Sequence, residues 1–148
     1  MNTSFSIKDC RLIDIPTFAD ERGVISVLDK ELPFEVKRIF WLHHIYPNKD
    51  RGAHALLYGT EIMIALHGSF VVDLDDTNEK TSILLNDPTK GLIIMPGIWF
   101  RTHSYVDEGV SLVLADQEYQ RGRYTYDYKE YQSVSYTHLR AHETGRNL

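Results

Sequence analysis

The chain has 148 residues, 43% of them hydrophobic and 11% aromatic, and a formal net charge of −5. This length suits a single domain with a buried core. The negative charge argues against nucleic-acid binding, which needs a basic surface to neutralise phosphates. No apolar run approaches the ~20 residues that cross a bilayer, so we expect no membrane association. The single cysteine, Cys10, excludes an internal disulfide and any multi-thiolate metal site, and a cytoplasmic location is expected.

Short β-rich runs separated by turn residues follow one another along the chain, and long helical periodicity is almost absent. Turn-tolerant sequences stand at HGS (67–69), DDTNE (75–79), NDPTK (86–90) and VDEG (106–109). The predicted strands are residues 23–29, 36–45, 61–74, 81–85, 91–95, 98–104 and 110–115. Seven or more strands with tight connections predict an all-β sandwich or barrel.

The C-terminal part of the chain differs from this pattern. The polar and aromatic segment 122–132 is expected to form a terminal helix or a lid over one mouth of the barrel. The last sixteen residues, 133–148, show neither strand alternation nor an apolar helical face. We therefore divide the chain into a domain of residues 1–132 and a disordered or vector-derived tail of residues 133–148.

The stretch RGAHALLYGTE, residues 51–61, contains the first chemical signal. Residues 54 and 56 of a strand point to the same face. With Glu61 and with Gly68, which we expect to close a hairpin, they have the spacing of the first cupin motif: H-x-H, four residues, Glu, six residues, Gly. His54 fills the first histidine position, but Leu56 fills the second.

The second cupin motif places a further histidine just after a Pro/Gly turn. Here MPGIWF supplies the turn, and Phe100 stands where that histidine belongs. A cupin metal site uses three imidazoles and a carboxylate, and a divalent transition metal needs several such donors. Only His54 and Glu61 remain, so we predict no metal and no other cofactor.

From residue 7 to residue 132 the chain resembles the dTDP-4-keto-6-deoxyglucose 3,4-ketoisomerase family, the FdtA/WxcM-like members of the RmlC-like cupins. The matching segments are DERGVISVLD (20–29), PFEVKRIFWL (33–42), RGAHA (51–55), HGSFVVDLDD (67–76), GLIIMPGIW (91–99) and SLVLADQEY (111–119). The resemblance implies a cupin jelly roll, or double-stranded β-helix, that forms a homodimer. It implies a metal-free isomerase of deoxysugar and polysaccharide biosynthesis. Such an enzyme moves the keto group between C4 and C3 of a dTDP-linked 4-keto-6-deoxy sugar through an enediol.

The same resemblance assigns the proton transfers to the H-x-H pair, of which only His54 matches. One neutral imidazole, with an ordinary pKa near 6.5, can remove the proton and return it if both carbons face it. Arg51 matches the arginine before the pair. We expect Arg51 to contact the diphosphate, since guanidinium forks match phosphate oxygens, and Arg38 is a further candidate for substrate binding. Tyr58 and Glu61 complete the predicted substrate-binding residues, although Glu61 could instead satisfy a hydrogen bond inside the barrel.

Strand alternation also predicts which nearby side chains lie outside the barrel. Trp99, Arg101 and His103 alternate with Phe100, so we expect them on the outer face.

Two other hypotheses about the function stay open. Because two of the three site histidines are absent, the chain could be a catalytically degenerate cupin that acts as a sugar-nucleotide-binding or partner module. It could also be a related nucleotide-sugar epimerase, or an isomerase of a differently substituted sugar.

Overall fold

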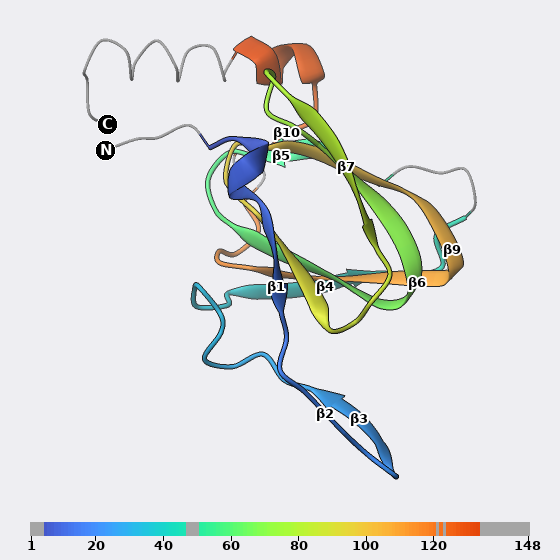
Figure 1. Cartoon of the computed structure of the whole chain (residues 1–148). Helices are drawn as coiled ribbons and strands as arrows, with labels where there is room; N and C mark the ends of the chain where they lie inside the picture. The colour runs from blue at the N-terminus through green and yellow to red at the C-terminus, as the bar shows by residue number, and fades with distance from the viewer. Residues whose placement is uncertain (1–4, 47–50, 121, 123, 134–148) are drawn as a thin grey trace.

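A computed structural model describes residues 5–46, 51–120, 122 and 124–133 of the chain, and it is built almost entirely from strands (Figure 1). The elements in chain order are η1 (Ile7–Asp9), β1 (Arg11–Asp14), β2 (Thr17–Asp20), β3 (Gly23–Ser26), β4 (Arg38–Leu42), β5 (Arg51–Leu56), β6 (Glu61–Asp75), β7 (Lys80–Leu85), β8 (Lys90–Ile94), β9 (Trp99–Ala115), β10 (Tyr124–Thr125) and a helix at 128–133. No helix in this part of the chain is long and apolar enough to span a membrane.

One eight-stranded antiparallel sheet forms the body of the protein and curls into a roll (Figure 1). Its strand order is β1-β8-β6-β9-β5-β10, with β4 added along β9 and β7 added along β6. The long strands β6 and β9 pair from Glu61 opposite Ala115 to Asp75 opposite Trp99. The first part of β6 also pairs with β8, whereas its last part pairs with β7. This arrangement confirms the predicted all-β jelly roll.

The long strands bend where the sequence predicted turns. Residues 67–69 and 106–109 lie inside β6 and β9, where the pairing shifts register. Gly68 has a left-handed φ of 60°, and a Cβ placed there would lie 2.4 Å from the carbonyl oxygen of Val106. The prediction that Gly68 closes a hairpin is therefore wrong. Turn-tolerant residues also form bulges, so the two strands predicted at 98–104 and 110–115 are one bent strand.

Both faces of the curled sheet are packed. Phe70, Val72 and Leu74 belong to the inner core and are at most 1% exposed. On the outer face, Ile62 and Ile64 pack with Ile93 and Leu114, and this cluster is covered by apolar side chains of residues 28–36. A strand buried on both faces is apolar at consecutive positions, which explains the run EIMIA at 61–65.

The strands β2 and β3 form a separate hairpin that stands away from the roll (Figure 1). Every residue of this hairpin is exposed, including Phe18, Val24 and Ile25 at 63%, 68% and 59%. The outer face of β4 is also uncovered, with Trp41 58% exposed. Exposed large apolar side chains grouped on one element are typical of contacts with other molecules.

Candidate active site

His54 projects from β5 toward the interior of the roll. It lies directly opposite Phe100 of β9, and cross-strand partners share one face of a sheet. Phe100 is a member of the inner core and is 3% exposed. Three aromatic rings surround the imidazole, with centroid distances of 4.7 Å to Phe100, 5.1 Å to Tyr124 and 5.5 Å to Tyr126.

This environment keeps the imidazole of His54 uncharged. Burial, together with the positive charge of Arg38, lowers its pKa from 6.5 to about 4. Both effects disfavour the imidazolium, because burial removes hydration and a like charge repels. At neutral pH His54 is therefore a proton acceptor.

A buried ion pair lies beside this histidine. Arg38 of β4 and Glu61 of β6 are both aligned with Ala115, from the two sides of β9. The small Ala115 side chain leaves room for them to meet, with Arg38 Nη2 3.5 Å from Glu61 Oε2. Their side chains are only 17% and 3% exposed. Among the described residues, Arg38 Nε and Glu61 Oε2 have no hydrogen-bond partner. Buried polar atoms without partners are rare, and each of these two has an unused hydrogen-bonding capacity.

The carboxyl of Glu61 titrates near neutrality. Burial, opposed by the charge of Arg38 and assisted by Asp116, raises its pKa from 4.5 to about 7. Desolvation therefore outweighs the attraction of the guanidinium. Glu61 can therefore hold or release a proton at physiological pH.

The segment 124–133, called here the C-terminal segment, closes one side of the site. Its strand β10 pairs with β5, with Tyr124 opposite Leu56. The guanidinium of Arg38 donates a hydrogen bond to the Tyr124 hydroxyl. Further along, Tyr131 is 1% exposed, and its hydroxyl reaches the backbone carbonyls of Asp75 and Gly97 at 3.0 and 2.8 Å. The sequence predicted either a helix or a lid here, and the segment provides a short helix together with tyrosines packed over His54.

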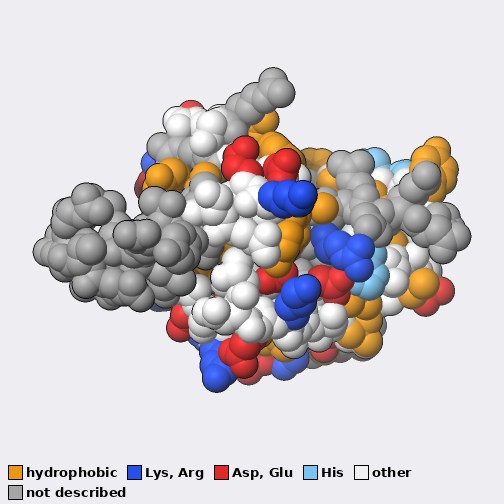
Figure 2. Space-filling model, turned by 90° about the horizontal axis from the view of Figure 1, so that it is seen from above, with side chains coloured by type: hydrophobic (Ala, Val, Ile, Leu, Met, Phe, Trp, Pro, Cys, Tyr) orange, Lys and Arg blue, Asp and Glu red, His pale blue; other side chains and the backbone are white. Residues whose placement is uncertain are grey.

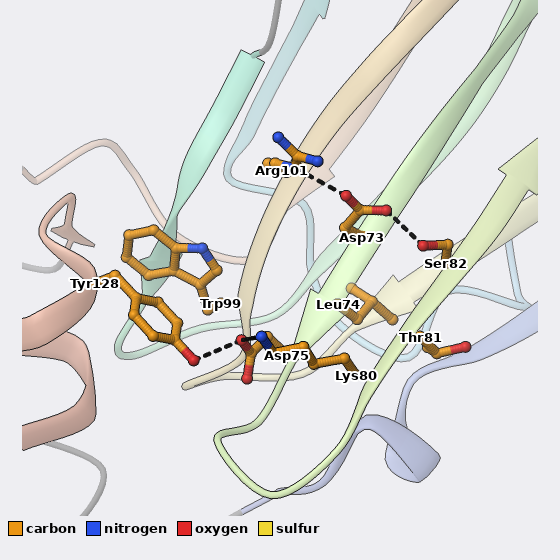
Figure 3. A pocket seen from close by; sticks show the side chains of 9 residues that line it. All are labelled: Asp73, Leu74, Asp75, Lys80, Thr81, Ser82, Trp99, Arg101 and Tyr128. Carbon is orange, nitrogen blue, oxygen red and sulfur yellow. Dashed lines mark hydrogen bonds and ion pairs between the residues drawn. The ribbon is translucent and has the colours of Figure 1, made fainter.

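A separate cavity of about 530 Å³ lies on the outer face of β6, β7 and β9 (Figure 3). Its polar groups bind one another: Arg101 Nε donates to Asp73 at 2.8 Å, and the Tyr128 hydroxyl donates to Asp75 at 2.7 Å. The ring of Trp99 packs edge-on against Tyr128 at 5.2 Å. The contacts of Tyr128 attach the C-terminal segment to the roll and the Arg101–Asp73 bond joins β9 to β6, so we assign these groups a structural role.

The structure brings together three of the five predicted site residues, namely His54, Arg38 and Glu61. Arg51 begins β5 opposite Thr102, but its side chain lies outside the described residues, so its contact with phosphate stays a prediction. Tyr58 is 54% exposed, and its binding role also stays a prediction.

The predicted outer-face residues are confirmed. His103 Nε2 lies 3.0 Å from Asp73, which also binds Arg101, on the side of β9 away from Phe100. The space-filling view shows basic and acidic side chains interspersed, with hydrophobic side chains between them (Figure 2).

The donor set does not fit a transition metal. Among the described residues, no three His, Cys, Asp or Glu side chains come together as metal ligands. Leu56 and Phe100, at the two positions where cupin motifs have histidines, are buried at 4% and 3% exposure. The absence of a metal remains a prediction.

Sequence reasoning did not identify Tyr124 as a site residue. The available signal was the alternation of tyrosines at 124, 126 and 128. That signal could not be placed, because a two-residue strand such as β10 has no recognisable pattern of its own.

An antiparallel jelly roll that directs an imidazole, a carboxylate and a guanidinium into its interior is a cupin with the groups needed for acid–base chemistry. The chain matches the FdtA family model, described as WxcM-like, C-terminal, over residues 8–136, and it belongs to this family. The family resemblance seen in the sequence is confirmed.

Individual relatives are similar over most of their length. The chain is 29% identical over 123 residues to a TDP-4-oxo-6-deoxy-alpha-D-glucose-3,4-oxoisomerase of Aneurinibacillus thermoaerophilus, covering 82% of this chain and 88% of that protein. A 3,4-ketoisomerase from Helicobacter canadensis superposes with a TM-score of 0.84 at 32% identity, covering 86% of this chain and 98% of that one. QdtA, a sugar 3,4-ketoisomerase from Thermoanaerobacterium thermosaccharolyticum solved with TDP, has a TM-score of 0.86 at 28% identity, covering 89% and 98% of the two chains.

Proposed function

We propose that this protein is a nucleotide-sugar 3,4-ketoisomerase that moves the keto group between C4 and C3 of a TDP-linked 4-keto-6-deoxy sugar. The observation that carries the proposal is the partly buried, neutral His54 beside Arg38 in a chain of this family. Among the relatives, a His-to-Asn mutant of QdtA has been crystallised with TDP-4-keto-6-deoxyglucose. These relatives favour an isomerase over a non-catalytic binding module.

His54 is the base of the reaction and then its acid. The neutral imidazole removes the proton from C3, which produces an enediol, and the imidazolium returns that proton to C4. A positioned acid–base group of this kind contributes about 10²- to 10⁴-fold in rate. The depressed pKa of His54 supports this order of events, since the resting imidazole is unprotonated and its imidazolium is a strong acid.

The ion pair beside His54 binds the substrate oxygens nearest the reacting carbons. Arg38 Nε and Glu61 Oε2 offer one donor and one acceptor without partners among the described residues. A ligand that satisfies both removes the cost of leaving them unpaired. Arg51 contacts the diphosphate, as the resemblance implies, and the exposed Tyr58 also contacts the substrate.

Replacing His54 by asparagine tests the activity. Wild-type protein incubated in D₂O with TDP-4-keto-6-deoxyglucose should yield the 3-keto isomer with deuterium at C4, and should exchange deuterium into C3 of the remaining 4-keto sugar, both followed by NMR. His54→Asn should abolish both while retaining TDP binding. Equal exchange in the two proteins would remove His54 from the mechanism. TDP binding without turnover by the wild type would support the binding-module hypothesis, and a product inverted at a ring carbon would support the epimerase.

We also propose that the protein is a homodimer, as the family resemblance implies. The exposed apolar hairpin β2–β3 and the exposed Trp41 support this, because they bury little within their own chain. Light scattering should give twice the monomer mass for the wild type and a lower mass for Ile25→Asp. A monomeric wild type would contradict the proposal.

A further inference from the structure

The position of the missing second imidazole is covered by a phenol. Leu56 stands where the H-x-H pattern has its second histidine, and Tyr124 of β10 is its direct cross-strand partner. Cross-strand partners share one face of a sheet, so Tyr124 lies on the face from which His54 projects. The two rings are 5.1 Å apart between centroids.

The Tyr124 hydroxyl is also held by a cation. Arg38 donates a hydrogen bond to it, and the same guanidinium is 3.5 Å from Glu61. The ring of Tyr124 lies beneath the guanidinium as well, 5.8 Å from ring centroid to Arg38 Cζ. A phenol bound in this way can lose its proton, because the resulting phenolate is stabilised by a charge-assisted hydrogen bond.

The resting state of this phenol is protonated. Burial raises the pKa of Tyr124, and the nearby Glu61 adds to the shift, against the hydrogen bond and charge of Arg38. Tyr124 is therefore a proton donor at neutral pH, whereas His54 is an acceptor. Two adjacent groups whose environments hold them in opposite protonation states are suited to paired acid and base roles.

We propose that Tyr124 is the second proton-transfer group of the isomerisation, carrying the proton between the two substrate oxygens while His54 carries the proton between the two carbons. This proposal rests on the ketoisomerase function proposed above. It explains how the reaction proceeds although Leu56 and Phe100 replace two of the motif histidines.

The steps balance without any further reactant. His54 takes the C3 proton, the C–H electron pair forms the C3=C4 double bond, and the carbonyl pair moves to O4. O4 takes the phenolic proton of Tyr124, which gives the enediol and a phenolate bound to Arg38. The phenolate then takes the proton of O3 as the C3 carbonyl forms, and the double-bond pair takes the proton of the His54 imidazolium at C4. Enzyme and protons return to their starting states.

The test compares two tyrosines of the same segment. Tyr124→Phe removes only the proposed proton carrier, and Tyr128→Phe removes a hydroxyl that binds Asp75 on the outer face. We expect Tyr124→Phe to lower kcat at least 100-fold with TDP affinity within about threefold of wild type. Tyr128→Phe should keep kcat within about threefold while lowering the melting temperature.

A series of fluorinated tyrosines at position 124 separates a chemical role from a packing role. Each fluorine lowers the phenol pKa, so the alkaline limb of the kcat–pH profile should move to lower pH in the same order. A kcat for Tyr124→Phe close to wild type, or an alkaline limb that ignores fluorination, would overturn the role of Tyr124. Failure of the wild type to isomerise the sugar would instead overturn the proposed function, so the two failures are distinguishable.

Discussion

Lowering the pH should leave His54 neutral well below the range in which an ordinary histidine becomes charged. Its pKa is lowered from 6.5 to about 4 by burial among aromatic rings and by Arg38. At about pH 5.5 an unperturbed imidazole is about 90% protonated, whereas His54 should be only about 3% protonated. The acid limb of kcat/KM should therefore fall near pH 4 if His54 is the essential base of the free enzyme.

The lowered pKa of His54 also makes the free energy of unfolding depend on pH. Moving an imidazole pKa from 6.5 to about 4 corresponds to about 3 kcal/mol in favour of the neutral form. The folded pKa is below the unfolded one, so the unfolded chain takes up the proton first as the pH falls. The contribution of His54 to the free energy of unfolding is thus complete above pH 6.5 and is lost progressively down to about pH 4.

NMR titration of the histidine side chains measures this pKa directly, and the His54→Asn variant identifies the resonance. Phe100→Ala should move the His54 pKa upward, because water enters where the Phe100 ring packs at 4.7 Å. Leu84→Ala is the control, since Leu84 is 56% exposed and its loss should leave the titration unchanged. A wild-type His54 that titrates at pH 6 or above would refute the reasoning from burial.

Three further predictions concern charge, backbone and binding. Glu61 has a folded pKa of about 7, above its ordinary 4.5, so its contribution to stability is present below pH 4.5 and is lost as the pH rises through 7. Urea unfolding should show that, between pH 4 and pH 8, the free energy of unfolding of Glu61→Gln rises by about 3 kcal/mol relative to that of the wild type. The same pH dependence in both proteins would contradict this. Gly68→Ala should lower the free energy of unfolding by at least about 2 kcal/mol, because its Cβ would meet the Val106 carbonyl oxygen. A loss under about 1 kcal/mol would show that β6 and β9 move apart to make room for the Cβ. Arg51→Met should weaken TDP binding by at least about tenfold in calorimetry, with wild-type affinity counting against a phosphate contact.

Most of the sheet could be predicted because strand formation leaves a local pattern. The strands β6, β7 and β8 lie where alternating or fully apolar runs predicted them, and alternation from Phe100 correctly placed Arg101 and His103 outside the roll. The strands β1 and β2 were not predicted, and Gly68 and residues 106–109 were wrongly predicted as turns between strands. There a residue that tolerates a turn also tolerates a bulge, and only the partner strand decides between them.

The candidate site was predictable only in part. His54 could be found because a spaced motif surrounds it. The meeting of Arg38 and Glu61 could not, since it depends on both strands flanking Ala115 of β9. The sequence likewise offers no reason for Tyr124 to bind Arg38, from which it is 86 residues distant.

The amino-acid sequence by itself determined the all-β class, the inward direction of His54 and the family to which the chain belongs, because strand alternation and motif spacing are local properties of neighbouring residues. The tertiary structure alone decided the protonation states of the site and the partner of Leu56. Burial depends on which rings enclose a group, and cross-strand register is fixed by the whole curled sheet rather than by either strand.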